Sequence, residues 1–575
     1  MNYPKQAAKL MHKNKRRQGL ALAVCLALGV LSSPLYAQDA LLGTEPPLER
    51  GQQLLNAGSY IAAIDSFQRV NGFDEEAALL GLGRAYALTG QYEEGIALLE
   101  DEIGAYAISP VLSTQLAELL RTTGQSARAL DILEEVVSEN TTPPVRALVQ
   151  YGSLLQFLGR RDEAIAPLNA AIARYDNGMV FDSEEVAMVA LASWLLDRFH
   201  DANSLFSEAT RVDPNNLEAQ VLWGDLFMEK FNTPDAEKSY DAALAINRRY
   251  GPALIGQAKI SGGERSLSFA LSVNERDVKA LETMATLLVL NNRQEDAEEF
   301  IEAALEINPE SIKSLSLKAT QAAMKEEFAE FAQLEAQVKS FSPNNPHFYG
   351  DIADAFGNNY RFTEAVGYAR QAIAADPNYW QGHTLLGTNL IRLGEEEAGR
   401  ESLELAFDND PFNVMTSNML KVFDTLEEYA TLRTEHFEVR MSQSDAVVLW
   451  PYMAPLIEEN WATLTEKYGF EPEAPVLIEI FDRTEDFAVR SVGLPDIGPL
   501  VGICFGKVVT LISPATLDAN WQEILWHELV HVFTLQMTNN RMPRWLSEGI
   551  STWEEREARP EWGRRQYRIS ARRRG

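Results

Sequence analysis

The chain has 575 residues, of which 46% are hydrophobic and 23% are charged, and this composition is typical of a folded protein with more than one domain. Its formal net charge of −32 argues against non-specific binding to nucleic acids, because such binding requires a basic surface. We therefore expect no nucleic-acid partner.

The N-terminal residues 1–37 have the pattern of an export signal. Six lysines and arginines precede an apolar run at 19–31, which is too short to span a bilayer comfortably. Pro34 follows, and the segment 35–37 ends in a small residue just before the expected cleavage point. An uncleaved anchor helix is the alternative interpretation.

Cleavage after Ala37 would remove Cys25 and leave Cys504 alone, so the mature chain would contain no internal disulfide. No later stretch reaches 18 consecutive apolar residues, so we expect no integral membrane span after signal cleavage. The sequence thus predicts a periplasmic or secreted protein with a Sec-type signal peptide.

A period of 34 residues dominates the next part of the chain. Pro309, Pro343, Pro377 and Pro411 lie 34 residues apart in similar contexts. Proline ends a helix, so the regular spacing predicts a series of helical units that end at these points.

The period and its inner pattern resemble the tetratricopeptide repeat, as in one unit where small residues at 224, 236 and 243 surround Tyr240. The resemblance implies about eleven units at 44–413, stacked into a superhelical solenoid. It also implies a concave surface for a protein or peptide partner, with a mere spacer as the alternative. The unit at 251–277 is short, and its Gly262-Gly263 pair predicts a loop or a kink.

After a connector at 414–429, the pattern changes to that of a small α+β domain at 430–560. Strands are predicted at 436–441, 476–481 and 502–513, the last interrupted at Gly506, and a helix is predicted at 445–468.

A helix predicted at 521–537 carries the candidate chemistry, in the stretch "WHELVHVF". Asn520 and Glu523 predict a capping box at its start. His527 and His531 are four residues apart, so both project from one face at a spacing that suits one Zn²⁺ ion. Glu528 would then face the open side of the metal, where it would act as the general base toward a metal-activated water.

Zinc hydrolases need a third protein ligand, and the stretch "PRWLSEG" contains Glu548. The pair "HELVH" and "WLSEG" resembles the gluzincin metallopeptidases, and the wider stretch resembles the peptidase-MA-like domains that bacteria append to tetratricopeptide arrays. This resemblance implies His527, His531 and Glu548 as zinc ligands and Glu528 as the catalytic base. The expected fold is therefore mainly α: a tetratricopeptide solenoid followed by an α+β gluzincin-type domain.

The surroundings of the predicted zinc site depart from the resemblance in two ways. The residue that would orient a ligand histidine falls at Thr552, which has no charge, and Glu554 or Glu555 are substitutes. A transition-state donor would be expected after this helix, where the one later tyrosine is Tyr567, and a plain tail residue is the alternative reading of it.

The glycine-interrupted strand before the metal helix is where a peptide substrate would pair as an added strand. The candidate residues are Gly506, Lys507, Val508 and Val509, with an ordinary core strand as the alternative. Cys504 nearby is interpreted as a small buried hydrophobe. The basic segment 561–575 fits either a solvated tail or the end of a truncated or frame-shifted reading.

The leading hypothesis is an exported zinc metallopeptidase whose repeats recruit a protein substrate or partner. The alternative is a cell-envelope scaffold or assembly factor in which the repeats bind proteins and the zinc domain is not catalytic. A metal hydrolase that acts on a non-peptide bond is a third possibility.

Overall fold

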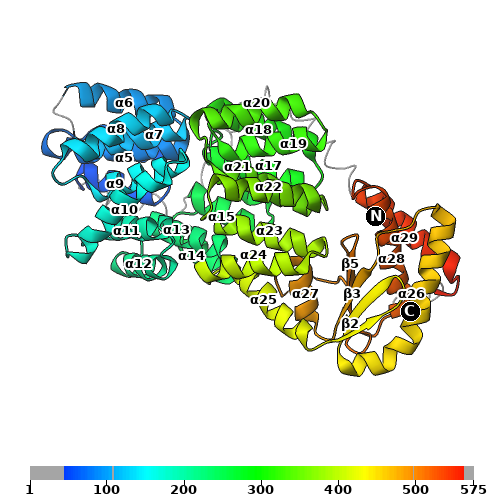
Figure 1. Cartoon of the computed structure of the whole chain (residues 1–575). Coiled ribbons are helices and arrows are strands. Elements are labelled where there is room, and N and C mark those ends of the chain that lie inside the picture. Colours follow the sequence, from blue (N-terminus) through cyan, green and yellow to red (C-terminus); the bar gives the residue numbers. More distant parts are fainter. Residues whose placement is uncertain (1–44, 106–108, 496–497, 563–575) are drawn as a thin grey trace, which may run out of the picture.

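The computed structural model describes residues 45–105, 109–495 and 498–562. The predicted export signal at 1–37, with Cys25, lies outside the described residues, as do residues 563–575 of the predicted tail with Tyr567. The described chain contains a long helical array followed by a small mixed sheet with its own helices (Figure 1).

Eleven antiparallel helix pairs, with one short 3₁₀ helix between the first two pairs, make up the described array. In chain order they are α3 (Pro47–Asn56) and α4 (Tyr60–Phe67), then η2 (Gly72–Asp74), α5 (Glu75–Thr89) and α6 (Tyr92–Ala105), α7 (Pro110–Thr122) and α8 (Ser126–Glu139), α9 (Val145–Phe157) and α10 (Arg161–Asp176), α11 (Ser183–Leu195) and α12 (Phe199–Val212), α13 (Leu217–Glu229) and α14 (Thr233–Ile246), α15 (Gly251–Ser261) and α16 (Glu264–Val273), α17 (Val278–Leu290) and α18 (Gln294–Ile307), α19 (Ile312–Met324) and α20 (Phe328–Phe341), α21 (Pro346–Asn358) and α22 (Phe362–Ala375), and α23 (Trp380–Arg392) and α24 (Glu396–Asn409). The predicted mainly helical solenoid is confirmed. The Gly262-Gly263 pair forms the turn between α15 and α16, where Gly262 has a φ of +62°.

Small residues allow the helices of neighbouring units to approach closely. The ring of Tyr240 in α14 is fully buried between Gly224 and Gly256, and an added Cβ atom would lie 2.6 Å and 2.3 Å from it, respectively. The Tyr240 hydroxyl donates a hydrogen bond to Asp225 at 2.7 Å. The repeat pattern is therefore a packing pattern, in which glycine and alanine make room for one aromatic ring.

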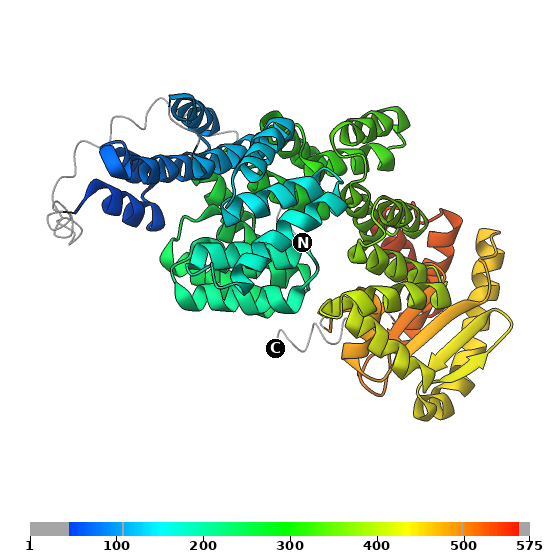
Figure 2. The same ribbon diagram turned by 60° about the vertical axis from the view of Figure 1, so that its left-hand side comes forward.

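The superhelix is tight enough for its successive turns to contact each other (Figure 2). Asn247 and Asn274 donate hydrogen bonds, both at 3.1 Å, to the hydroxyls of Tyr60 and Tyr92, which lie more than 180 residues earlier. Further along, the ammonium of Lys230 lies 2.7 Å from the carboxylate of Asp410, and both side chains are almost completely buried. These contacts between successive turns stabilise the superhelix.

The helix that follows the array, α25 (Val414–Glu427), occupies the predicted connector at 414–429 and packs on α24 and α27 (Thr484–Val492). The sheet that follows has the order β1-β2-β3-β5-β4. Its strands are β1 (Ala430–Arg433), β2 (Phe437–Met441), β3 (Val476–Phe481), β4 (Gly502–Cys504) and β5 (Val508–Ile512). β2, β3 and β5 are parallel, and the two outer strands are antiparallel to their neighbours.

Helices cover both faces of this sheet. On one face lie α26 (Gln443–Tyr468) and α28 (Trp521–Met537), with core residues such as Ile457 and Val530. On the other face, Phe481 and Val508 of the sheet share a core with Phe362, which belongs to the repeats. The sheet domain is thus joined to the end of the array through a common hydrophobic core.

A buried ionic network reinforces this junction. Arg490 of α27 lies 2.7 Å from Glu479 of β3, and both side chains are fully buried. Arg440 of β2 lies 3.8 Å from the same Glu479 and 2.7 Å from Glu396 of α24. Because each charge has a partner, the network holds the sheet in a fixed orientation on the last repeats.

The segment predicted as one strand at 502–513 is a hairpin, and the prediction of its substrate-binding part is wrong. Gly506 has a φ of +100° and forms the turn, after which β5 runs between β3 and β4. Val508 and Val509 are fully buried in an inner strand, whose backbone groups already pair on both sides, and Lys507 pairs with Glu473 at 2.5 Å. A peptide therefore has no free strand edge at these residues.

Among the described residues, none of the helices combines the length and the apolar character needed to cross a lipid bilayer.

Candidate metal centre

The candidate site lies between α28 and α29 (Arg544–Ala558), which pack against each other. α28 begins at Trp521, and the predicted capping box does not form: the Asn520 amide donates to the Glu523 carboxylate at 3.0 Å instead of binding the first helical turn. α29 begins directly after Pro543, which has no N–H to leave unpaired.

Three predicted ligand atoms converge in the space between the two helices. Nε2 of His527 lies 3.2 Å from Oε2 of Glu548 and 3.1 Å from Nε2 of His531. Nε2 of His531 lies 3.7 Å from the same carboxylate oxygen. His527, His531 and Glu548 thus form a three-residue cluster with the composition and spacing of a metal site.

The spacing of these atoms fits tetrahedral zinc. Bonds of about 2.0–2.1 Å at tetrahedral angles place neighbouring ligand atoms about 3.3 Å apart. The three observed separations, 3.1, 3.2 and 3.7 Å, bracket this value. The side chains present therefore fit a zinc ion without rearrangement of either helix, and three protein ligands leave the fourth position for water or substrate.

The other nitrogen of each histidine is held by α29. Nδ1 of His527 pairs with the carboxylate of Glu555, and Nδ1 of His531 lies 2.7 Å from the hydroxyl of Ser547 and 3.3 Å from that of Ser551. These contacts direct both Nε2 atoms toward the common point, as metal-binding histidines require.

Thr552, the predicted orienting residue, makes no hydrogen bond to either histidine in the part of the chain that the structure describes. Glu555 takes that role. Glu554, the other substitute, is buried and binds Lys467 and Tyr468 of α26 at 2.8 and 2.6 Å, so it fixes α29 on the domain core instead.

Glu528 is buried beside the ligands and next to the edge strand β4. A Cβ atom at Gly502 would lie only 2.8 Å from Oε1 of Glu528, so the absence of a side chain at Gly502 makes room for this carboxylate. Burial raises the pKa of Glu528, and the two histidines act in the opposite direction. A raised pKa suits a group that must accept a proton and later release it.

The carboxylates around the histidines give the site a negative field. Burial lowers the pKa of His527, but hydrogen bonds to Glu548 and Glu555 outweigh it and raise that pKa to about 10. The same contact with His527, followed by that with His531, holds the pKa of Glu548 far below its usual range. The same negative field that stabilises a positive charge on His527 also favours a divalent cation at this point, which would take the place of the proton.

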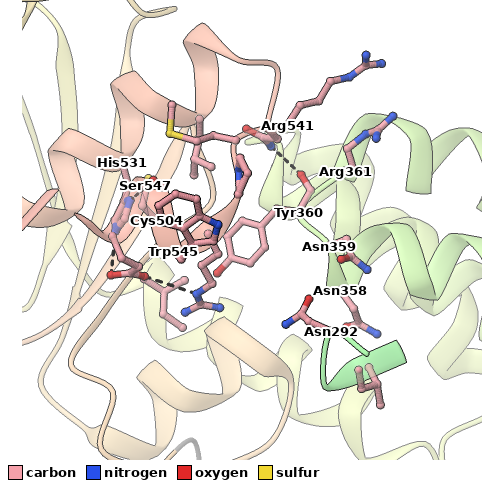
Figure 3. A pocket seen from close by; sticks show the side chains of 18 of the residues that line it. Asn292, Asn358, Asn359, Tyr360, Arg361, Cys504, His531, Arg541, Trp545 and Ser547 are labelled. Carbon is pink, nitrogen blue, oxygen red and sulfur yellow. Dashed lines mark hydrogen bonds and ion pairs between the residues drawn. The ribbon is translucent and has the colours of Figure 1, made fainter. Parts of the chain in front are cut away.

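One large cavity, of about 1480 Å³, contains the site and extends to the repeats. His527, Glu528, His531 and Glu548 line one side of it. The opposite side is formed by α17, α19 and α21 and by the turn after α21. In this turn, Asn358, Asn359 and Tyr360 face the helices α28 and α29 that carry the candidate ligands (Figure 3). The predicted recruiting array is therefore also a wall of the candidate active site.

Several residues of the site were not identified from the sequence. Ser547, Ser551, Gly502, Arg544 and Tyr360 surround the cluster, and of these Arg544 lies 3.5 Å from Glu548. The serines lie in the same helix as Glu548 and follow a four-residue spacing with Glu555, a signal available in the sequence. Cys504 is a buried thiol in the cavity wall, and burial raises its pKa strongly, in agreement with its interpretation as a small hydrophobe.

Comparisons with known proteins match the repeats. Residues 351–414 match the family model "Tetratricopeptide repeat". A "Protein SGT1 homolog" of Oryza sativa is 28% identical over 146 residues, which are 25% of this chain and 38% of that protein. A "DnaJ homolog subfamily C member 7" of Mus musculus is 28% identical over 116 residues, 20% of this chain and 24% of that protein.

A "TPR repeat-containing thioredoxin TTL4" of Arabidopsis thaliana is 36% identical over 76 residues, 13% of this chain and 11% of that protein. The chain therefore spans between 11% and 38% of the length of these curated relatives. The crystal structure of yeast Tom70 is 14% identical, with a TM-score of 0.32, and the match covers 68% of this chain and 90% of that one.

The match to the family model ends at residue 414 and includes none of the candidate zinc ligands. The comparisons thus support repeats that bind other proteins, and they agree better with the scaffold alternative than with a peptidase.

Proposed function

We propose that this chain, a tetratricopeptide-repeat protein, is a zinc-dependent peptidase of the gluzincin type in which His527, His531 and Glu548 hold Zn²⁺. The observation that carries the proposal is the convergence of the three ligand atoms at separations of 3.1–3.7 Å. An accidental histidine pair on a helix would not be expected to meet a carboxylate of a second helix and to have both remaining ring nitrogens occupied by that helix.

Zinc, when bound there, would polarise the carbonyl group of a substrate and acidify a water molecule for attack on it. Glu528 would accept the proton of that water and transfer it to the leaving amine. Burial of Glu528 raises its pKa and favours the neutral form, which helps the carboxylate to accept the proton. Glu555 and Ser547 would keep the histidine rings in position during the reaction.

The shape of the site supports a polypeptide substrate. β4 is an edge strand, and its residue Gly502 lies beside Glu528, so an extended peptide could pair with β4 and pass the base. The cavity extends from there to the repeats, whose concave surface suits extended protein segments. Gly502–Cys504 thus replaces residues 506–509 as the proposed substrate strand.

The test compares the mature wild-type chain with Glu528→Gln. We expect both proteins to contain close to one zinc per chain when their metal content is measured by mass spectrometry. Only the wild type should cleave fluorescein-labelled casein. A wild-type chain without zinc at neutral pH would overturn the proposal.

The second candidate function is the envelope scaffold, which the comparisons favour because they match only repeat proteins. In this case the repeats would act by binding proteins and the metal cluster would stabilise the fold. Equal complementation of a deletion strain by the wild type and by Glu528→Gln would support the scaffold, whereas failure of the variant would support the peptidase.

We further propose that the chain acts outside the cytoplasm. The support is the charged, apolar and small-residue pattern of residues 1–37. A fusion of these residues to a reporter enzyme that is active only after export would test this, and an inactive reporter would contradict it.

A further inference from the structure

The turn between α21 and α22 faces the metal centre across the shared cavity. Asn358, Asn359 and Tyr360 line the cavity from this turn, and residues 499–504 line it from the sheet domain. The contact between the two sides is direct, because the Asn540 amide donates a hydrogen bond at 2.8 Å to the backbone carbonyl of Tyr360. The position of this turn relative to the metal helices is therefore fixed.

The conformation of Tyr360 is unfavourable for its residue type. Each of the eleven described helix pairs has one residue of positive φ in the turn between its two helices. Glycine occupies six of these positions: Gly58, Gly90, Gly124, Gly159, Gly262 and Gly394. Tyr360 has a φ of +63°, which bulky side chains rarely adopt. Asp197, Phe231, Asn292 and Glu326 occupy the same turn position in four other pairs, so the contacts of the Tyr360 side chain, and not its backbone conformation alone, distinguish this residue.

The side chain of Tyr360 bridges the two parts of the protein. Its ring stacks on Phe505 of the sheet domain, with 6.2 Å between the centroids, and contacts Phe362 of α22 at 5.4 Å. The guanidinium of Arg544 lies 5.7 Å from the centre of the ring, and Nε of Arg544 lies 3.5 Å from the ligand Glu548. Arg544 thus lies between the ring of Tyr360 and the metal cluster.

The hydroxyl of Tyr360 is available to a substrate. Figure 3 shows the ring extending from the repeat toward the helix that carries His531. Within the described part of the chain, the hydroxyl makes no hydrogen bond with another residue, whereas the hydroxyls of Tyr60, Tyr92 and Tyr240 all do. Burial raises the pKa of Tyr360, Arg544 lowers it and Glu528 raises it, so the phenol keeps its proton at neutral pH and remains a donor.

We propose that Tyr360, a residue of the tenth repeat, contacts the substrate and donates a hydrogen bond to the carbonyl oxygen of the peptide bond that water attacks. Negative charge develops on this oxygen during the attack, and a fixed neutral donor stabilises it. Tyr360 forms and breaks no covalent bond and keeps its proton throughout. This inference rests on the proposed peptidase function, and it makes the array a part of the active site rather than a separate recruiting arm.

The experiment measures the binding of a dipeptide phosphonamidate to the zinc-loaded mature chain by calorimetry. The tetrahedral P–O⁻ group of this probe stands in for the oxygen of the attacked carbonyl. Tyr360→Phe removes only the hydroxyl and keeps the stacked ring, so we expect unchanged zinc content and melting temperature but about tenfold weaker binding of the probe. On casein, kcat should fall by a similar factor while KM changes little.

The matched control is Tyr368→Phe in α22 of the same repeat. Tyr368 packs against Phe356 and does not line the cavity, so this variant should bind the probe like the wild type. Equal binding by Tyr360→Phe and the wild type would overturn the inference and leave the proposed function intact. Loss of zinc in Tyr360→Phe would also overturn it, by showing a role in holding the metal. A wild type that binds neither zinc nor the probe would refute the proposed function and the inference together.

Discussion

Removal of the Glu555 carboxylate should weaken zinc binding, although this residue is not one of the three proposed ligands. Its carboxylate pairs with Nδ1 of His527, and the side chain is only 13% exposed, so solvent screens the interaction weakly. Loss of a partner of this kind typically lowers metal affinity about 10- to 100-fold, which corresponds to about 1.4–2.7 kcal/mol. We therefore expect this loss in Glu555→Ala and a smaller one in Glu555→Gln, which keeps a hydrogen-bond acceptor.

The assay is a competition titration of zinc against a chromophoric chelator at neutral pH. Thr552→Ala is the matched control, because Thr552 lies in the same helix and makes no hydrogen bond to either histidine among the described residues, so the zinc affinity of this variant should stay within about twofold of the wild type. Wild-type affinity in Glu555→Ala, or an equal loss in Thr552→Ala, would refute the argument that Glu555 orients His527.

Three further perturbations test other parts of the structure. Gly502→Ala should retain zinc but lower kcat on casein at least tenfold, since its Cβ would displace the carboxylate of Glu528. Gly549→Ala is the control and should keep the wild-type kcat, because an added Cβ there meets nothing within 4 Å. Equal activities of the two variants would contradict the placement of the base. Lys230→Ala should lower the free energy of unfolding in urea by about 3 kcal/mol, because it leaves the buried Asp410 carboxylate unpaired. The double variant, with alanine at both 230 and 410, should lose less stability. An unchanged stability of Lys230→Ala would show that this contact between superhelical turns is unimportant. Removal of zinc by a chelator should lower the free energy of unfolding by about 2.7 kcal/mol, relative to the protein in free zinc at about 100 times the Kd. An unchanged melting temperature would contradict a metal site linked to folding.

The repeats and the candidate zinc ligands were accessible from the sequence because both are set by local spacing. The period of 34 residues reflects one helix pair per unit, and the four-residue interval between His527 and His531 is one helical turn. The third ligand, Glu548, lies in the next helix and was identified through a resemblance, not through spacing alone.

The sequence placed the orienting residue at Thr552, with Glu554 or Glu555 as substitutes, and could not choose between them because the rotation of α29 is not visible in the sequence. At about 100° per residue, Thr552 projects about 40° to one side of Glu548, whereas Ser551 and Glu555 project about 60° and 20° to the other side. The histidines face the row formed by Ser547, Ser551 and Glu555. α29 packs on α28 and is tied to α26 through Glu554, and a sequence pattern does not report these contacts between helices.

The substrate strand and the role of the repeats depended on contacts between distant segments. The glycine at 506 was compatible with an interrupted strand or with a hairpin, and only the pairing of β4 with β5 distinguishes them. Tyr360 and Asn540 are 180 residues apart and touch because the superhelix ends against the sheet. No periodicity could have predicted that this turn would face the candidate metal site.

The central claim is tested most directly by the metal content and coordination of the purified mature chain. Elemental analysis combined with zinc X-ray absorption spectroscopy should give one zinc per chain with two imidazole ligands, and His531→Ala should lose most of the metal. A chain without zinc, or a zinc signal that is unchanged in His531→Ala, would contradict the account.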